Sequence, residues 1–375
     1  MIVQDRLIQE FMELVRVDSE TGNERQIADV LKAKFSALGL TAIEDDSQER
    51  TGHGAGNLFV TWAADSGAAG PKLLFTCHMD TVVPGQNIKP ILREDGWITS
   101  DGSTILGSDD KAGLAALFEA IRVIQEQKIP HGQIQFVITA GEESGLLGAR
   151  AMDPSHLDAD MGFALDSNGE VGGIAVAAPA QARVTMQIFG KSAHAGVNPE
   201  DGISAIQVAS KAISAMKLGR IDKETTANIG KFAGGGPTNV VCDHVQLDAE
   251  ARSIVQEKVE LQIASMREAL ETTVREYGAE CEFRSEIIYP AFSFNEHDPV
   301  VQLADRAITS LGLKTRLFPS GGGSDANVFN GLKVPTVNLA IGYEHIHTTK
   351  ERIKAEDIVK TAELVVAIVK ESVKA

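Results

Sequence analysis

The sequence is poor in cysteine and in basic residues. Only three cysteines occur in 375 residues, at Cys77, Cys242 and Cys281, and none belongs to a CxxC pair. A disulfide framework or a thiolate zinc site is therefore not expected. Lys and Arg number 35 against 52 Asp and Glu, which gives a formal net charge of −17. This acidic balance argues against a nucleic-acid partner and against binding to an anionic membrane surface.

Long apolar runs are also missing. No segment approaches the roughly 18 consecutive apolar residues that span a bilayer, and the first 18 residues carry charges throughout an amphipathic pattern. We expect neither a signal peptide nor an anchor, and the low cysteine content then favours the cytoplasm. Apolar residues make up 43% and charged residues 23%, as in ordinary folded proteins, and the length favours two domains.

Apolar strand patterns alternate with helix patterns along the first part of the chain. A helix pattern at 113–127 lies among strand patterns at 57–62, 72–77, 133–139 and 161–165. Strands that alternate with helices predict a mostly parallel sheet flanked by helices.

The pattern changes near Pro179 to the order β-α-β-β-α-β, which is that of a ferredoxin-like α+β unit. Its predicted elements are strands at 181–190, 226–232, 244–252 and 280–288 and helices at 203–216 and 255–276. Strand and helix alternation returns after this unit. The sequence thus predicts one α/β domain, residues 1–179 and 291–375, interrupted by a smaller α+β domain, residues 180–290.

Histidine and carboxylate side chains gather where the predicted strands end. His78 and Asp80 follow one apolar strand, and Asp166 follows another. Open α/β sheets bind ligands at the carboxyl ends of their strands, and a carboxylate near a histidine can fix its tautomer for metal binding. A polar loop with a solvated Asp is the alternative for the first pair.

Two pairs of adjacent acids extend this set. Asp109 and Asp110 stand at a helix entry, where one Asp could be an ordinary N-cap, but two neighbouring carboxylates repel unless a positive charge compensates them. Glu142 and Glu143 follow an apolar strand between glycines. One glutamate could bind a metal while the other holds a proton of water; a surface loop with two acids is the alternative.

Two of the nine histidines, His345 and His347, lie close together near the C-terminus. Imidazoles and carboxylates without thiolates are donors that suit zinc, with manganese or cobalt as alternatives.

These motifs, in this order, resemble those of the M20 family of metallopeptidases, and most closely its peptidase T-like members. The resemblance extends over essentially the whole chain, through HMDTV, LGSDDKAG, GEESG, ALDS, GKSAHAG and HTTKE. It implies two zinc ions per subunit that share a bridging water. The ligand positions that it implies are His78, Asp109 and Asp166 at one metal, with Asp109 bridging, and Glu143 and His347 at the other.

The resemblance also implies roles for neighbouring side chains. Asp80 matches the acid that orients His78, and Glu142 matches the general base. Asp109 is chosen over the acid after it because the family's bridging acid stands two residues before a lysine, here Lys111. His347 is chosen over the histidine before it because the family's histidine precedes an acid by four positions.

The inserted domain resembles the family's lid and dimerisation domain. His194 matches the histidine that reaches the partner subunit's active site and stabilises the oxyanion, and Asn239 and Arg252 match substrate-binding positions. Without the family, a surface histidine, a turn asparagine and a strand-end arginine are the simpler interpretations. In the glycine-rich loop at 320–329, Gly322 and Gly323 offer backbone N–H groups to a substrate, although a hinge is an equal alternative.

The expected function is a zinc-dependent exopeptidase that acts on short peptides as a homodimer, most simply a tripeptide aminopeptidase. The same fold and metal site also serve carboxypeptidases, dipeptidases and N-acyl amino acid deacylases, because the lid selects the substrate. A non-catalytic metal- or peptide-binding protein is the alternative from another class. It predicts loss of Glu142, which is present.

Overall fold

The chain folds into two compact units in the computed structural model, which describes residues 1–374. The first unit comprises residues 1–177, 294–320 and the described chain from 324 onward. The second comprises residues 178–293 together with 321–323. The chain therefore leaves the first unit next to Pro179 and returns to it after a long insertion.

A nine-stranded sheet has the order β1-β2-β6-β3-β7-β16-β8-β14, with β15 paired to β8, and its strands other than the two-residue edge strand β14 form the centre of the first unit. The strands β6, β3, β7 and β16 run parallel, whereas β1, β2 and β8 join antiparallel to their inner neighbours. This confirms the mostly parallel sheet. The strands are β1 (Ala42–Glu44), β2 (Leu58–Trp62), β3 (Leu73–His78), β6 (Ile134–Thr139), β7 (Met161–Ser167), β8 (Gly173–Ala178), β14 (Phe292–Ser293), β15 (Arg316–Pro319) and β16 (Thr336–Ala340).

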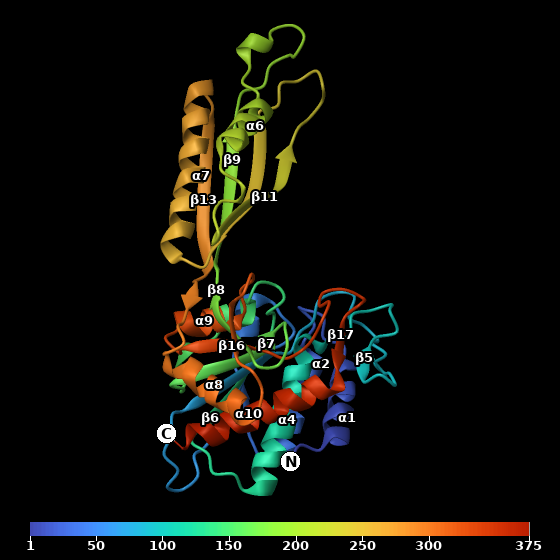
Figure 1. Cartoon of the computed structure of the whole chain (residues 1–375). Helices are drawn as coiled ribbons and strands as arrows, with labels where there is room; N and C mark the ends of the chain where they lie inside the picture. The colour runs from blue at the N-terminus through green and yellow to red at the C-terminus, as the bar shows by residue number, and fades with distance from the viewer. Residues whose placement is uncertain (375) are drawn as a thin grey trace. The chain divides into compact units, whose positions relative to one another are not determined.

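The central strands are buried along their whole length because helices cover both faces of the sheet. All six residues of β3 and all six of β6 are buried, as expected for parallel strands packed on two sides. Figure 1 shows α4, α8 and α10 on one side of the sheet and α9 on the other. The helices are α1 (Gln4–Val15), α2 (Arg25–Ala37), α3 (Ser47–Thr51), α4 (Ser108–Gln127), α5 (Leu147–Ala151), α8 (Pro299–Ser310), α9 (Asp325–Gly331) and α10 (Ala355–Ser372).

Aromatic rings join the helical layer to the sheet. The ring centroid of Phe35 on α2 lies 4.8 Å from that of Phe118 on α4 and 6.0 Å from that of Phe136 on β6. A small second sheet in the order β17-β5-β4 lies at the surface of this unit. Its strands are β4 (Ile91–Leu92), β5 (Trp97–Thr99) and β17 (Arg352–Lys354).

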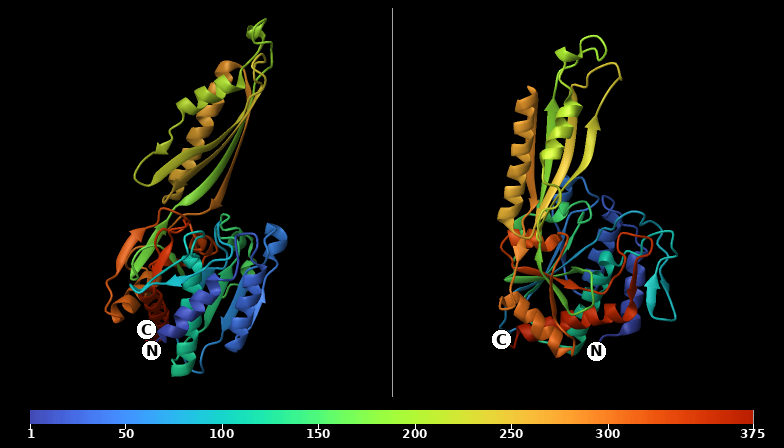
Figure 2. Two further views of the ribbon diagram at one scale, coloured as in Figure 1. Left: turned by 90° about the vertical axis from the view of Figure 1, so that its right-hand side faces the viewer. Right: turned by 45° about the horizontal axis from the view of Figure 1, so that its top comes forward.

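The second unit is a separate antiparallel sheet with two helices, in the strand order β10-β11-β12-β9-β13. Buried and less buried residues alternate along β9 and β12, and Figure 2 shows α6 and α7 on one face of the sheet. The elements are β9 (Ala180–Phe189), α6 (Ala205–Ala215), β10 (Gly219–Arg220), β11 (Thr225–Gly234), β12 (His244–Ser253), α7 (Gln256–Tyr277) and β13 (Glu280–Tyr289). The α+β character expected of the insertion is confirmed.

The structure differs from the sequence-based prediction in several short elements. Strand β8 was not predicted, because its glycine and alanine residues give a weak strand pattern. His78 is the last residue of β3 and Asp166 the sixth residue of β7, so both lie within strands whose pairing continues to these positions, rather than after them. None of the helices in the described part of the chain has the length and apolar character needed to cross a bilayer.

We predict that Phe35→Ala lowers the free energy of unfolding by about 3–5 kcal/mol, because a fully buried ring leaves a cavity between α2, α4 and β6. Chemical denaturation measures this change. Ile43→Ala is the control, since Ile43 is 55% exposed and its loss should have little effect. Equal destabilisation by the two substitutions would contradict the packing described.

Candidate metal centre

The His78 imidazole is held on one side and faces carboxylates on the other. Its Nδ1 lies 3.0 Å from the main-chain oxygen of Asp80 and 3.5 Å from Asp80 Oδ1. Its Nε2 lies 3.0 Å from Asp109 Oδ1 and 3.8 Å from Asp166 Oδ1. An imidazole fixed through one nitrogen presents the other as a defined donor to a cation.

The two oxygens of Asp109 face two different histidines. Oδ1 contacts His78, and Oδ2 lies 3.2 Å from His347 Nε2, which also lies 3.1 Å from Glu143 Oε1. Ligand atoms of His78, Asp109 and Asp166 lie within 4.8 Å of one another, as do those of Asp109, Glu143 and His347. The structure thus brings the five expected ligand residues together in two groups that share Asp109.

This donor set fits a pair of divalent cations. Each group offers one imidazole nitrogen and carboxylate oxygens, which are zinc ligands, and no thiolate. A carboxylate placed between two imidazoles can bridge two cations, one through each oxygen.

The position of Asp109 depends on a carboxylate that is distant in sequence. Glu351, which is buried, accepts hydrogen bonds from the backbone N–H groups of Leu106, Gly107 and Asp109 at 2.8, 2.9 and 3.1 Å. It also accepts one from the Ser108 hydroxyl at 2.6 Å. The turn starts at Gly107 with φ of +75°, a conformation that glycine adopts without strain. Four donors on one carboxylate therefore fix the turn that presents Asp109.

The loop of Glu142 and Glu143 is held by Asp80. Asp80 Oδ1 accepts a hydrogen bond from the Glu142 N–H at 3.1 Å, and Oδ2 accepts one from the Glu143 N–H at 3.2 Å. Asp80 is fully buried. It lies beside His78 and fixes the Glu142 backbone at the same time, so it couples the two sides of the site.

Two further side chains support the site and were not identified from the sequence. Asn338 Oδ1 accepts a hydrogen bond from the Asp166 N–H at 3.0 Å, and Asn338 Nδ2 donates one to the Asp166 carbonyl at 2.6 Å. The Tyr343 hydroxyl donates to Asp166 Oδ1 at 3.1 Å. Of these residues, only Asn338 could have been noticed in the sequence, because it is a polar residue within the apolar pattern of β16.

Burial and mutual repulsion raise the pKa values of several carboxyl groups. Burial raises the pKa of Glu142 well above its usual value, and the charges of Asp325, Glu143 and Asp109 raise it further. Burial, then the charge of Asp109, does the same for the pKa of Asp166. Such shifts are typical of functional sites, because structure alone gains nothing from crowding buried acids.

Neighbouring carboxylates raise the pKa values of the two imidazoles in the metal-free protein. Hydrogen bonds to Asp109 and Glu143 raise the pKa of His347 to about 10. Burial alone would lower the pKa of His78, but its hydrogen bonds to Asp109 and Asp80 outweigh burial and raise this pKa well above its ordinary value.

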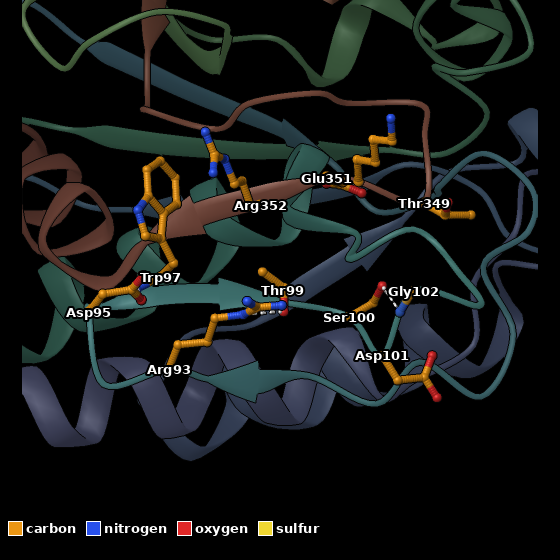
Figure 3. A pocket seen from close by; sticks show the side chains of 11 residues that line it. Arg93, Asp95, Trp97, Thr99, Ser100, Asp101, Gly102, Thr349, Glu351 and Arg352 are labelled. Atoms are coloured by element: carbon orange, nitrogen blue, oxygen red, sulfur yellow. Dashed lines mark hydrogen bonds between the residues drawn. The ribbon is translucent and has the colours of Figure 1, made fainter.

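A surface pocket of about 320 Å³ is lined by residues of β5, of β17 and of the loops beside them (Figure 3). Arg352 stacks at 4.1 Å over the Trp97 ring in its wall and pairs with Glu344 at 2.6 Å. Glu351 also lines the pocket, but none of the five expected ligand residues does. The pocket is therefore separate from the chemistry of the metal groups.

The other expected site residues belong to the second unit. His194 is exposed and its Nδ1 accepts a hydrogen bond from the Gly196 N–H at 3.1 Å. Asn239 is exposed, and Arg252 on β12 pairs with Glu250 at 3.0 Å. Gly322 and Gly323 lie in the short segment 321–323 of this unit.

Comparison with known proteins gives a family match and full-length relatives. The model of the peptidase family M20/M25/M40 matches residues 74–371. The uncharacterized protein YqjE of Bacillus subtilis strain 168 is 56% identical over 100% of both chains. The crystal structure of aminopeptidase PepT from Bacillus cereus ATCC 10987 matches with a TM-score of 0.93 at 58% identity, and that of a tripeptidase from Staphylococcus aureus subsp. aureus Mu50 with 0.95 at 50%. Both matches cover 100% of each chain.

We predict that metal binding at neutral pH releases protons, because the two imidazoles must be neutral to bind a cation and their pKa values are raised in the metal-free protein, as are the pKa values of the ligand carboxyl groups of Asp166 and Glu143. Since the pKa of His347 is about 10, the apparent affinity should rise with pH up to that value. Calorimetric titration in buffers of different ionisation enthalpy measures the release.

In this titration His347→Ala should release fewer protons than the wild type. His345→Ala is the matched control, because His345 is exposed and belongs to neither ligand group. Proton release that does not change in His347→Ala would show that His347 is not a ligand.

Proposed function

The chain belongs to the peptidase family M20/M25/M40, and from this membership we propose that it is a zinc-dependent aminopeptidase that releases the N-terminal residue of short peptides, tripeptides first. The observation that carries the proposal is the division of the Asp109 oxygens between His78 and His347, 3.0 and 3.2 Å away. Full-length similarity to an aminopeptidase and a tripeptidase supports the substrate class.

Two divalent cations, when bound, would polarise the scissile carbonyl and make a water molecule more acidic. The residues proposed to hold them are His78, Asp109, Asp166, Glu143 and His347. Glu142 is the proposed general base: its backbone is fixed by Asp80, and its raised pKa suits a group that takes a proton from water and gives it to the leaving amine.

Related chemistry on other amides is the principal alternative. A carboxypeptidase, a dipeptidase and an N-acyl amino acid deacylase would all use the same base and the same ligands, and they would differ only in which end of the substrate is recognised. The alternatives are therefore separated by substrate and not by the metal groups.

We predict that the zinc-loaded protein removes the N-terminal residue of a free tripeptide and that N-acylation of the peptide blocks this cleavage. Product analysis on free, N-acylated and C-amidated tripeptides and on N-acyl amino acids tests the prediction. Release of the C-terminal residue would instead identify a carboxypeptidase, and release of an acyl group a deacylase. No turnover of any substrate would favour the non-catalytic alternative.

Glu142→Gln should lower kcat by about 100-fold or more, because the amide cannot take the proton, while two metal ions per chain remain bound. Metal content by atomic emission and kcat on the tripeptide give both results. Glu268→Gln on α7 is the matched control, since Glu268 is exposed and belongs to none of the ligand groups. Retained turnover in Glu142→Gln would contradict the assigned base.

The second unit is the proposed lid, and we propose that it forms a homodimer in which His194 reaches the partner subunit's site. Asn239, Arg252, Gly322 and Gly323 are the proposed substrate contacts. The exposure of His194 is compatible with a role outside its own unit.

Subunit mixing tests whether His194 acts across the dimer. Glu142→Gln and His194→Ala should each be nearly inactive, and mixing them after subunit exchange should restore about a quarter of wild-type activity, because half of the dimers then contain one complete site. Sedimentation velocity establishes the oligomeric state first. A dimer without restored activity would show that His194 does not act in trans, and a monomer would contradict the assembly itself.

A further inference from the structure

The loop that carries Glu142 and Glu143 is closed by its own backbone hydrogen bonds, with the N–H groups of Gly145 and Leu146 donating to the Glu142 carbonyl, and it is held from outside by side chains. It begins at Gly141 with φ of +66° and ends at Gly145 with φ of +94°, and glycine is the residue whose backbone has the greatest freedom. Asp80 holds the loop from one side through the N–H groups of Glu142 and Glu143. The other side of the loop is held through the hydroxyl of Ser144.

Ser144 Oγ takes part in three hydrogen bonds. It donates to the Gly141 carbonyl at 3.1 Å, accepts from the Thr21 hydroxyl at 3.2 Å, and lies 2.8 Å from His53 Nε2. A hydroxyl has one proton to donate and two lone pairs to accept with. With that proton directed to the Gly141 carbonyl, the Nε2–H tautomer of His53 completes the set, because the hydroxyl then accepts from the ring.

The His53 ring packs directly against the loop. Its side chain is 8% exposed, and a Cβ atom added at Gly141 would lie 2.4 Å from His53 Nε2. Gly141 is thus required by the approach of the ring as well as by its positive φ. The segment around His53 is itself anchored, because Glu24 accepts a hydrogen bond from the Gly54 N–H at 2.8 Å and Asn57 donates to the Gly148 carbonyl at 2.9 Å.

The cluster of Ser144, His53 and Glu24 does not have the geometry of a nucleophilic triad. Glu24 Oε1 lies 4.0 Å from Nε2, the nitrogen that already contacts Ser144. His53 Nδ1 has no hydrogen-bond partner within residues 1–374, so no third group orients the ring as a base. Ser144 also gives its own proton to Gly141. The arrangement supports the loop and does not activate the serine.

We propose that His53 is a positioning residue of the metal centre, which acts through Ser144 to hold Glu143 against its metal and Glu142 beside it. The inference rests on the proposed function, since it assigns a support to the same ligand and base. Partners of this kind typically change metal affinity or activity by about 10–100-fold when they are removed.

Co²⁺ titration of the full-length metal-free protein, followed by visible absorption, tests the proposal without a peptide substrate. The binding step that involves Glu143 is identified by its loss in Glu143→Gln. His53→Asn, whose shorter amide cannot reach Ser144, should raise Kd for this step about tenfold. His53→Gln places an amide N–H near the position of Nε2 and should retain the wild-type Kd.

His131→Asn is the matched control for replacing a buried histidine. His131 is 2% exposed and precedes the amino end of β6, whereas the loop follows its carboxyl end. This variant should retain the wild-type Kd. If His53→Asn fails to fold, Ser144→Ala removes the same hydrogen bond and should show the same tenfold weakening.

The inference is overturned if His53→Asn, or Ser144→Ala in its place, binds Co²⁺ as the wild type does, or if His53→Gln is weakened as much as His53→Asn. Failure of the metal centre itself has a different signature. Wild-type protein that binds fewer than two Co²⁺ ions would contradict the proposed function and this inference together.

Discussion

The site is organised around the Asp109 carboxylate, whose two oxygens face two imidazoles from different parts of the chain. His78 comes from the end of β3, and His347 comes from a loop near the C-terminus. This single carboxylate is therefore shared by the two ligand groups. The four donors to Glu351 and the glycine before the turn fix the backbone from which Asp109 extends.

Electrostatics explains why such a site needs cations. Several carboxyl groups are crowded together and buried, and burial is the largest cause of the raised pKa values of Glu142, Asp166 and Glu143. In the metal-free protein the two imidazoles supply positive charge only while they are protonated. Two divalent cations would supply more charge and leave the imidazoles neutral, which is the form that binds metal. The crowding of buried carboxyl groups thus underlies both the proposed metal-dependent hydrolysis and the predicted release of protons on metal binding.

The sequence reveals the sheet and the ligand types more readily than it reveals their supports. Apolar runs such as that of β3 are buried on both sides, so their pattern is strong and the parallel sheet is predictable. Carboxylates and histidines at the ends of those runs then indicate a metal site. The supports are different: Glu351 lies more than 200 residues from the turn it holds, and His53 lies 91 residues from Ser144. Contacts between residues so far apart leave no pattern in the local sequence. Strand β8 was missed for another reason: its small residues do not alternate clearly between apolar and polar.

Anomalous diffraction at the zinc absorption edge, on crystals of the zinc-loaded protein, tests the central claim most directly. The account predicts two peaks in this protein, one within bonding distance of His78 and Asp166, the other of Glu143 and His347, with one oxygen of Asp109 bound at each. A single peak, or two peaks of which only one is bound by Asp109, would contradict it.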